Sequence, residues 1–244
     1  MNKTLLDPAK DPMGAAILDF YNTKKSDRLR VFSSQFDEDR IPVRTLFRSQ
    51  KQMSIIEQTA LDMAEGEILD VGGGSGCHSL VLQRQKKNVT TIDISTLSVE
   101  VMTKRGVKSA KAINLFDPDF NQKFDTILLL MNGSGIIGKI ENMGAFFARM
   151  KELLNPGGSI LMDSSDLSYL YEEEDHSIVI DIAGDYYGEI DYKMQYKDVM
   201  GDSFDWLYVD FNTLELYANQ NGFNAQLIKE GLHYDYLAKL SLIK

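Results

Sequence analysis

A glycine-rich turn carries the clearest chemical signal in this chain. The mostly apolar run Glu67–Val71 is followed by four glycines, Gly72, Gly73, Gly74 and Gly76. Glycine lets the backbone turn sharply and lets a ligand lie against it, and the start of a following helix presents free N–H groups. Those groups suit a carboxylate or another anion. The turn therefore predicts a site for a small anionic or zwitterionic cofactor; the competing interpretation is a tight strand-to-helix turn without a ligand.

The spacing of these glycines separates two classes of cofactor. Gly72, Gly74 and Gly76 give the pattern G-x-G-x-G. The dinucleotide fingerprint G-x-G-x-x-G needs a third glycine where this chain has Cys77. The loop therefore disfavours NAD and FAD, and a nucleotide-dependent dehydrogenase is the least supported class of enzyme.

A second polar residue, Asp93, follows the strand predicted over 89–92. It lies about seventeen residues after the last loop glycine, close to the spacing of ~20 at which a carboxylate binds a cofactor ribose. Asp93, with its neighbour Ile94, is therefore a candidate for the ribose site. The competing role is to cap the helix that begins near Ser95, although Ser95 is itself the better cap.

Three further side chains could act as general bases. Asp163 and Asp166 stand at the end of the strand predicted over 159–163, where the carboxyl ends of parallel strands bind ligands. His78 lies one turn into the helix after the glycines, and its side chain titrates near neutral pH. Each could take a proton from an acceptor group. The competing roles are helix caps for the two acids and a structural, hydrogen-bonded side chain for His78. The histidines lack metal-ligand spacing, so no metal is expected.

Several of these motifs occur together in one known family. Asp70 two positions before the first glycine, the glycine loop, Asp93 and the turn Pro156-Gly157-Gly158 resemble class I S-adenosylmethionine-dependent methyltransferases over roughly residues 50–244. More narrowly, the chain is similar to a group of small bacterial methyltransferases of unassigned substrate. That second resemblance rests on residues 47–48, 76–78, 104–107, 163–166 and 204–207.

The resemblance implies S-adenosylmethionine as the cofactor and assigns parts of its site. The methionine end would lie over the glycine loop, where Asp70 would help to hold its ammonium group. Asn114, at a position where the family commonly has an acid, would bond the adenine amino group, and the backbone N–H of Leu115 would meet a ring nitrogen. Met131 and Asn132 begin the loop where the family places the methyl donor opposite the acceptor. From the residues alone, Asn114 and Asn132 could also be ordinary turn and loop amides.

The elements that must position these residues alternate between short apolar runs and amphipathic stretches. Strands are predicted over 67–71, 89–92, 110–114, 126–131 and 159–163, with helices near 77–85, 95–105 and 140–153. This alternation predicts an α/β fold with a Rossmann-like doubly wound sheet, mostly parallel. A helix over 213–219 capped by Asn212 and strands over 223–229 and 236–243 follow, and the resemblance implies that the last strand is antiparallel.

Two regions stand outside this pattern. Residues 1–65 are predicted to form an N-terminal helical cap, with helices near 13–22 and 50–63 and a charged loop over 35–40. Residues 66–244 would form the S-adenosylmethionine-binding domain, with a β-hairpin inserted at about 186–210 and turning at 200–203. Tyr186, Tyr187 and Trp206 could wall an acceptor pocket or pack in the core. Arg44 and Arg48 of the cap could meet an acidic substrate.

Composition limits the partners. The chain has 244 residues and 43% hydrophobic content, enough for one sizeable α/β core. A net charge of −10 argues against nucleic acid, whose binding draws on clustered lysine and arginine. The single cysteine excludes an intrachain disulfide and suits a cytoplasmic protein, and no run approaches the ~18 apolar residues of a membrane span.

We therefore predict a cytoplasmic enzyme that transfers a methyl group from S-adenosylmethionine to a small-molecule acceptor. The alternatives are a non-catalytic regulatory module that binds the same cofactor, and an aminopropyl-type transferase on the same fold. The acceptor and the oligomeric state stay open.

Overall fold

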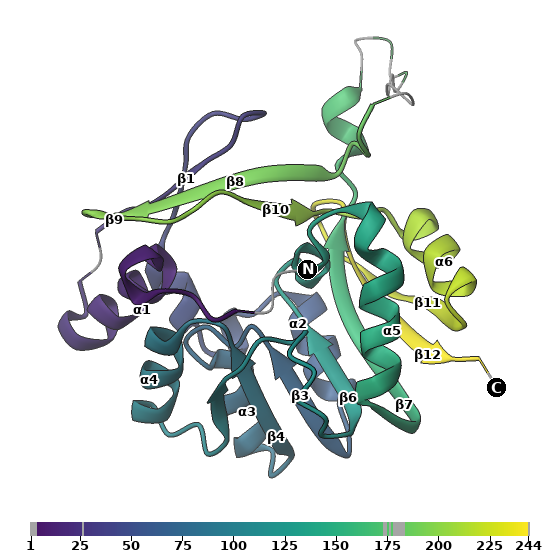
Figure 1. The fold of residues 1–244 in the computed structure, drawn as a ribbon, viewed down its shortest axis with the longest axis horizontal. Helices are drawn as coiled ribbons and strands as arrows, with labels where there is room; N and C mark the ends of the chain where they lie inside the picture. Colours follow the sequence, from purple (N-terminus) through teal and green to yellow (C-terminus); the bar gives the residue numbers. More distant parts are fainter. Residues whose placement is uncertain (1–3, 26, 173–174, 176, 178–183, 244) are drawn as a thin grey trace.

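A seven-stranded sheet forms the centre of the molecule (Figure 1). The structure is a computed structural model that describes residues 4–25, 27–172, 175, 177 and 184–243. The strand order is β11-β12-β7-β6-β3-β4-β5. The bounds are β3 Glu67–Val71, β4 Asn88–Asp93, β5 Ala110–Ala112, β6 Phe124–Leu129, β7 Leu154–Ser165, β11 Phe223–Glu230 and β12 Asp235–Leu242. Strands β3 to β7 pair in parallel, and β12 is antiparallel to both β7 and β11. The predicted doubly wound sheet with an antiparallel last strand is confirmed.

Helices cover both faces of this sheet because its strands are apolar on both sides. In β3, Ile68 packs with α2 and α3 in one core cluster, while the next residue, Leu69, packs with α5 and α6 in another. Neighbouring side chains of a strand point to opposite faces, so each strand contributes to both clusters. The helices are α2 Ile55–Met63, α3 Cys77–Arg84, α4 Thr96–Lys104, α5 Met143–Leu153 and α6 Phe211–Gln220.

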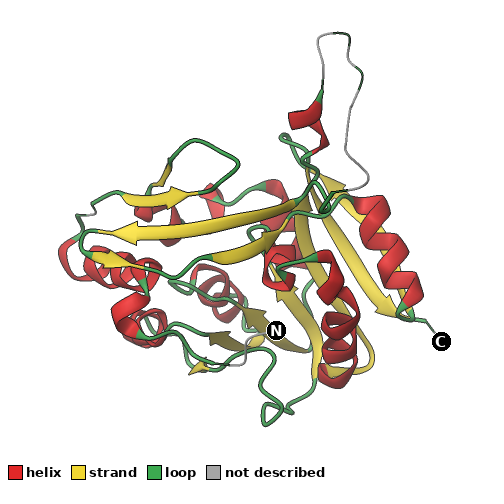
Figure 2. Cartoon of the chain, turned by 45° about the horizontal axis from the view of Figure 1, so that its top comes forward, coloured by secondary structure: helices red, strands yellow, loops and turns green. Residues whose placement is uncertain are grey.

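A second, antiparallel sheet lies across the carboxyl ends of the parallel strands (Figures 1 and 2). Its order is β10-β8-β1-β2, and β9 also pairs with β8. The bounds are β1 Leu29–Phe32, β2 Asp39–Ile41, β8 Glu189–Tyr196, β9 Val199–Met200 and β10 Phe204–Leu207. Val31 of β1 lies opposite Met194 of β8. The predicted hairpin is therefore present as part of this second sheet. The N-terminal region contributes two strands, β1 and β2, to the same sheet in addition to its helices.

The hairpin turns earlier than predicted. β8 ends at Tyr196, Lys197 takes a left-handed φ of 51°, and β9 returns so that Tyr196 faces Val199. Of the predicted turn at 200–203, Met200 belongs to β9, and residues 201–203 connect β9 to β10. Lysine is uncommon at a positive φ, whereas glycine favours it. The glycine at 201 therefore predicted the turn at the wrong position.

The N-terminal region packs beneath one end of the second sheet. Its α1 (Pro12–Thr23) shares a core cluster with Leu29 of β1 and Tyr196 of β8. The predicted helix over 50–63 divides into η3 (Gln50–Gln52) and α2, because Ser54 caps the second helix. The division of the chain at residue 65 stays a prediction, and the second sheet joins strands from both sides of it.

Short 3-10 helices complete the described chain. They are η1 Pro8–Lys10, η2 Val43–Phe47, η4 Gly133–Ile137, η5 Ile140–Asn142 and η6 Ser168–Tyr171. The cap of α6 is Asp210, whose side chain accepts a hydrogen bond from the Thr213 N–H, and not Asn212 as predicted. Within the described residues, no helix combines the length and the apolar character that a membrane span requires.

Candidate functional site

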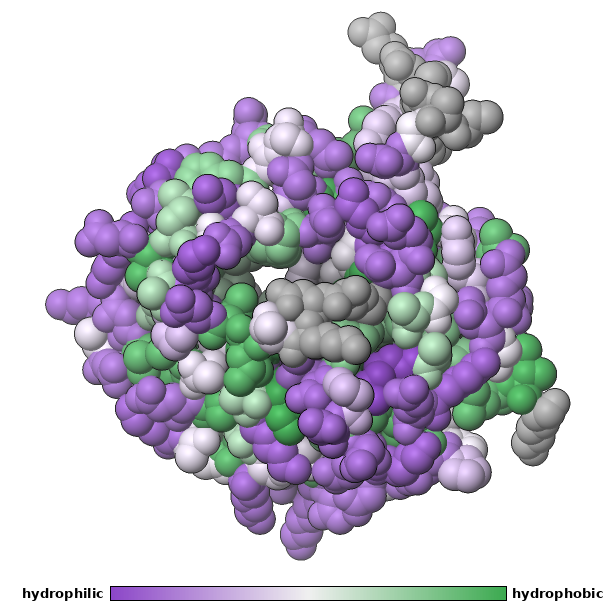
Figure 3. Space-filling model, viewed as in Figure 1, coloured by the Kyte–Doolittle hydropathy of each residue, from purple (hydrophilic) through white to green (hydrophobic). Residues whose placement is uncertain are grey.

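The glycine loop forms an open cradle between β3 and α3. Gly72 and Gly74 have φ values of +70° and +54°, which side chains rarely adopt. A Cβ atom on Gly72 would lie 3.9 Å from the nearest atom, in Ile136, and one on Gly74 would lie 3.9 Å from Ile17. These positions therefore face open space between η4 and α1. Figure 3 shows a hollow in this face of the molecule, below the second sheet.

Asp93 sits at the carboxyl end of β4, beside this cradle. Its carboxylate accepts hydrogen bonds of 2.8 Å from the backbone N–H groups of Gly74 and Ser95. Burial raises the pKa of the half-buried Asp93 to about 6, although both N–H bonds act in the opposite direction. The side chain of Ser95 caps α4 through the Ser98 N–H. Asp93 is therefore not the helix cap, and it links the glycine loop to the residues after β4.

The N-terminal segment, residues 4–11, runs along the carboxyl ends of β4 and β5. The Leu6 N–H donates to the carbonyl of Ile94 (3.0 Å), and the Asn114 side-chain amide donates to the carbonyl of Thr4 (3.0 Å). At its end, buried Asp11 accepts a hydrogen bond from the Ser95 hydroxyl. The segment thus borders the residues that the resemblance assigns to ribose and adenine. No motif in the sequence indicated it.

The Asn114 side chain also shapes its own turn. Its oxygen accepts a hydrogen bond of 3.0 Å from the Phe116 N–H, as in an ordinary Asx turn. The carbonyl of the adjacent Leu115 accepts from the Arg149 guanidinium at 2.7 Å. Both residues stand just after β5, at the same rim as Asp93.

Asp70 lies under the loop, away from its open side. Its side chain is 1% exposed, accepts a 2.5 Å hydrogen bond from the Ser79 hydroxyl, and lies 3.9 Å from Nδ1 of His78. Burial raises its pKa above the ordinary value. The Asp70 carboxylate therefore contacts α3 directly. Because it is buried under the loop, it is better placed to hold the loop against α3 than to contact a ligand itself.

His78 belongs to a buried charged cluster between α2 and α3. Its Nε2 atom lies 2.8 Å from Glu57, which also forms an ion pair with Arg48. Burial opposes ionisation of Glu57, but the hydrogen bonds from His78 and Arg48 outweigh it and lower its pKa to about 2. These contacts give His78 the structural role that competed with general base. Arg48 is buried and turned toward Glu57, and Arg44 is exposed.

Asp163 holds the loop between β6 and η4. Its two carboxylate oxygens accept from the backbone N–H groups of Met131 (3.1 Å) and Gly133 (2.8 Å). Met131 and Asn132 both have positive φ values, 70° and 54°, which is a strained backbone for residues with a Cβ. Burial raises the pKa of Asp163 to about 6. Asp163 thus fixes the strained backbone of the Met131 loop, which the family resemblance assigns to the point of methyl transfer.

The residues after Asp163 bind three further segments. The Ser164 hydroxyl oxygen accepts hydrogen bonds from the Ser134 hydroxyl (2.8 Å) and the Val209 N–H (2.9 Å). The Ser165 hydroxyl donates to the Asn132 side-chain oxygen at 2.8 Å. Asp166 accepts from the Tyr187 hydroxyl (2.9 Å) and the Ser168 N–H (2.8 Å).

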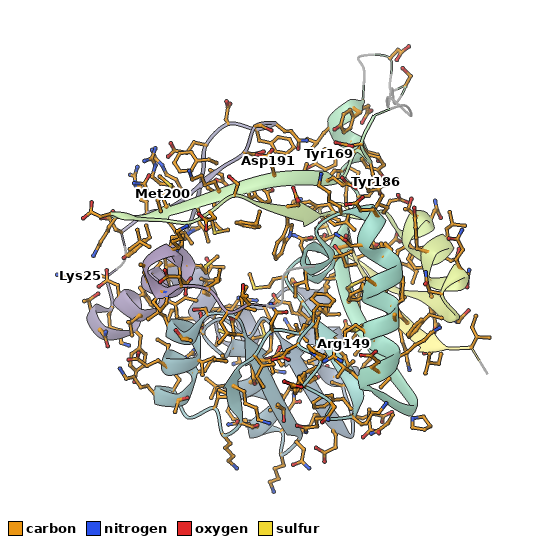
Figure 4. The ribbon with its side chains drawn as sticks, in the orientation of Figure 1. Lys25, Arg149, Tyr169, Tyr186, Asp191 and Met200 are labelled. Atoms are coloured by element: carbon orange, nitrogen blue, oxygen red, sulfur yellow. The ribbon has the colours of Figure 1, made fainter. Side chains whose placement is uncertain are left out.

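Two cavities have one lining residue in common, Ser165. The donor-side cavity, about 190 Å³, adjoins the Met131 loop and is lined by Ser54, Glu57, Met131, Asn132, Asp163, Ser165 and Asp235. The aromatic cavity, about 300 Å³, is lined by Phe36, Ser165, Leu167, Tyr169, Leu170, Tyr192, Tyr208 and His233. Tyr169 on η6 can be followed in Figure 4. The aromatic cavity draws on η6, β8, the β1–β2 loop and the β11–β12 loop, so only the tertiary fold assembles it.

The aromatic residues proposed from the sequence lie elsewhere. The Tyr186 hydroxyl donates to Asp210 at 2.6 Å, and Tyr187 donates to Asp166. Trp206 lies flat against Gly135, where a Cβ would be 1.8 Å from the indole ring. One missed residue did have a sequence signal, because Ser54 followed three residues later by Glu57 is a capping box.

Comparisons with known proteins agree with this geometry. A family model described as a methyltransferase domain matches residues 44–225. A SAM-dependent methyltransferase from Bacteroides fragilis, crystallised with S-adenosyl-L-homocysteine, is 65% identical, with a TM-score of 0.95 and 100% of each chain covered. No curated protein matches the chain significantly.

More distant structures share the fold. The CcbJ methyltransferase from Streptomyces caelestis has a TM-score of 0.63 at 13% identity and covers 98% of this chain and 100% of its own. A methyltransferase from Clostridium acetobutylicum has a TM-score of 0.55 at 15% identity and covers 78% and 89%. The glycine cradle and the strand order fit the same cofactor class. The chain therefore belongs to the class I S-adenosylmethionine-dependent methyltransferases.

Proposed function

We propose that the methyl acceptor is a small molecule bound in the aromatic cavity. The observation that carries this proposal is that the aromatic and donor-side cavities share Ser165. A molecule in the aromatic cavity would thus be one residue away from the Met131 loop. A cavity of about 300 Å³ falls at the lower end of the range for small organic ligands.

The cofactor would lie along the rim from the glycine loop to β5. Asp93 and Ile94 would contact the ribose, while Asn114 and Leu115 would border the adenine. The proposed site consists of Asp70, Gly72, Gly73, Gly74, Gly76, Asp93, Ile94, Asn114, Leu115, Met131 and Asn132. The open space beside Gly72 and Gly74 supports this placement, because a ligand can approach the backbone there.

S-adenosylmethionine supplies an activated methyl group on a sulfonium. The main task of the chain is to align acceptor and donor, since an in-line displacement is sensitive to geometry. Asp163 fixes the Met131 loop, and Ser165 ties that loop to β7 through Asn132. We therefore propose that Asp163, Asp166 and His78 are positioning residues, because each already has hydrogen-bonding partners within the protein.

The remaining predictions on partners and location are proposals of the same kind. The net charge of −10 supports a partner other than nucleic acid. The one cysteine, Cys77, is buried and free, which supports a reducing compartment such as the cytoplasm.

A turnover experiment tests the small-molecule acceptor. The purified chain is incubated with methyl-labelled S-adenosylmethionine and either a small-molecule extract or a protein and nucleic-acid fraction from the same cells. We expect label in small molecules, each heavier by one added methylene. Label found only in macromolecules would contradict the proposal. A product carrying an aminopropyl group, or binding without transfer, would favour one of the two alternative functions.

A further inference from the structure

The charges around the two cavities favour some acceptors over others. The donor-side cavity is lined by three acidic side chains, Glu57, Asp163 and Asp235. Glu57 is already paired with Arg48, so Asp163 and Asp235 are the two acids that count against an anionic acceptor. Neither cavity has a lysine or arginine among the described residues that line it. Among the described lining residues of both cavities, His233 is the one basic side chain, and it is exposed. A carboxylate or phosphate on the acceptor would lose its hydration without gaining a cationic partner, which is costly.

The aromatic cavity instead offers ring faces and hydroxyl oxygens. Phe36 and Tyr169 are each 39% exposed, and Tyr169 stacks on Tyr234 with ring centroids 4.6 Å apart. Ring faces attract cations. The hydroxyls of Tyr192 and Tyr208 lie 3.1 Å apart, so one of them donates to the other. Burial raises the pKa of both phenols, which keeps them uncharged, and their oxygens retain lone pairs that can accept from an N–H group.

The three side chains considered as general bases, Asp163, Asp166 and His78, are each held by hydrogen bonds within the protein. Asp163 accepts two backbone hydrogen bonds, and Asp166 accepts one from Tyr187 and one from Ser168. His78 is held by Glu57. A hydroxyl acceptor needs its proton removed as it attacks, and a positioned base normally does this. An amine that binds as an ammonium ion can lose its proton to water before the transfer, and the neutral nitrogen then attacks with its own lone pair, so no base is needed in the methyl-transfer step itself.

From these three observations, and resting on the proposed function, we propose that the acceptor is a small primary or secondary amine with an apolar or aromatic body. The body lies among Phe36, Tyr169, Tyr192 and Tyr208, and the nitrogen points past Ser165 toward the donor-side cavity. The bound ammonium first releases one proton to water. The lone pair of the neutral nitrogen then forms the new N–C bond while the C–S bond of the donor breaks, with its electron pair going to sulfur. The methylated ammonium product then releases a proton to water.

Binding of matched probes tests the amine without requiring turnover. Phenethylamine, phenethyl alcohol and phenylacetate share one ring and differ in the polar group. Each is titrated by calorimetry into the full chain saturated with S-adenosylhomocysteine. We expect the amine to bind at least about tenfold more tightly than the other two, as one cation–π contact and relief from charge repulsion together would give.

A pair of variants locates the effect. Tyr169→Leu removes a ring face that is already exposed, so the fold should survive, and it should weaken amine binding about three- to tenfold. Tyr21→Leu is the matched control on α1, away from both cavities, and should change nothing. Alcohol or carboxylate binding as tight as that of the amine, no binding of any probe, or an unchanged Tyr169→Leu variant would overturn the amine proposal.

The outcomes separate this inference from the proposed function. Labelled small molecules in the extract experiment, together with tighter binding of phenylacetate than of the amine, would leave the small-molecule acceptor standing and remove the amine. Absence of any labelled small molecule would remove the proposed function itself.

Discussion

The cofactor half and the acceptor half of this molecule are built in different ways. The cofactor half follows short local motifs, since the glycine loop, Asp93 and Asn114 each lie at the carboxyl end of a parallel strand or within two residues of it. The acceptor half is a second sheet in which β1 pairs with β8, more than a hundred residues later in the chain. The first region is thus encoded by consecutive residues, and the second only by tertiary contacts. The same fold can therefore keep its methyl donor while the acceptor site varies.

The largest expected difference between the two halves is in how much an ion pair contributes to the free energy of unfolding. Glu57→Gln should destabilise the fold by about 3–5 kcal/mol, because it leaves Arg48 buried without its partner. Urea unfolding measures this change. Since the pKa of Glu57 is lowered to about 2, its stabilising effect is present above pH 4.5 and is lost as the pH falls toward 2. The loss caused by the substitution should therefore shrink on acidification.

The acceptor half provides the control for that substitution. Glu38 pairs with Arg30 on the surface of the second sheet. Glu38→Gln should have no measurable effect on unfolding, because exposed ion pairs contribute little. If both variants lose the same free energy of unfolding, the buried ion pair of Glu57 is no more stabilising than the exposed ion pair of Glu38, and the contrast between the two halves fails.

The next largest effect is expected on cofactor affinity, after a substitution in the glycine loop. Gly74→Ala places a methyl group where the cofactor would lie, and should weaken S-adenosylhomocysteine binding about ten- to a hundredfold. Gly157→Ala is a matched control, since Gly157 also has a positive φ of 83° and open space around it but lies near the start of β7, outside the glycine loop. Both should cost similar folding stability, whereas only the first should affect calorimetric binding. A similar affinity for both variants would contradict the placement of the ligand.

Protonation of Asp93 gives a smaller effect. The pKa of Asp93 is raised to about 6, so the folded state favours the protonated acid, and its contribution to stability is lost as the pH rises through 6. The pH dependence of ligand affinity has the opposite sign to that of stability, because ribose hydroxyls would donate to the ionised carboxylate. Affinity for S-adenosylhomocysteine should fall by up to about tenfold between pH 7 and pH 5. Asp93→Asn should remove most of this slope, and an unchanged slope would exclude Asp93 from the ribose site.

The N-terminal segment should have the smallest effect. Leu6→Pro removes the N–H that bonds to Ile94, whereas Leu6→Ala keeps it. We expect the proline variant alone to weaken cofactor binding by about 0.5–1.5 kcal/mol, seen as faster ligand dissociation in stopped flow. If the two variants release ligand at the same rate, the segment does not support the adenosine end.

The same contrast explains what could be predicted from the sequence. β3, α3 and α4 were predicted within about a residue or two, because hydrophobic period and caps are local signals. The pairing of β1 with β8, the turn at Lys197 and the aromatic cavity were not predicted. Each depends on a partner or a backbone conformation that no nearby residue specifies. Tyr186 and Trp206 illustrate this, since both are aromatic residues of the hairpin region yet neither lines the cavity.

The junction at Ser165 offers the most direct test of the account. Ser165→Leu would fill the point where the two cavities meet, and Ser165→Ala would leave it open. Both variants lose the hydrogen bond from Ser165 to Asn132, so Ser165→Ala controls for that loss. We predict that the two variants bind S-adenosylhomocysteine equally well, that Ser165→Ala labels small molecules in the extract experiment, and that Ser165→Leu does not. Labelling by Ser165→Leu at the rate of the unmodified chain would contradict the claim that the acceptor reaches the donor from the aromatic cavity.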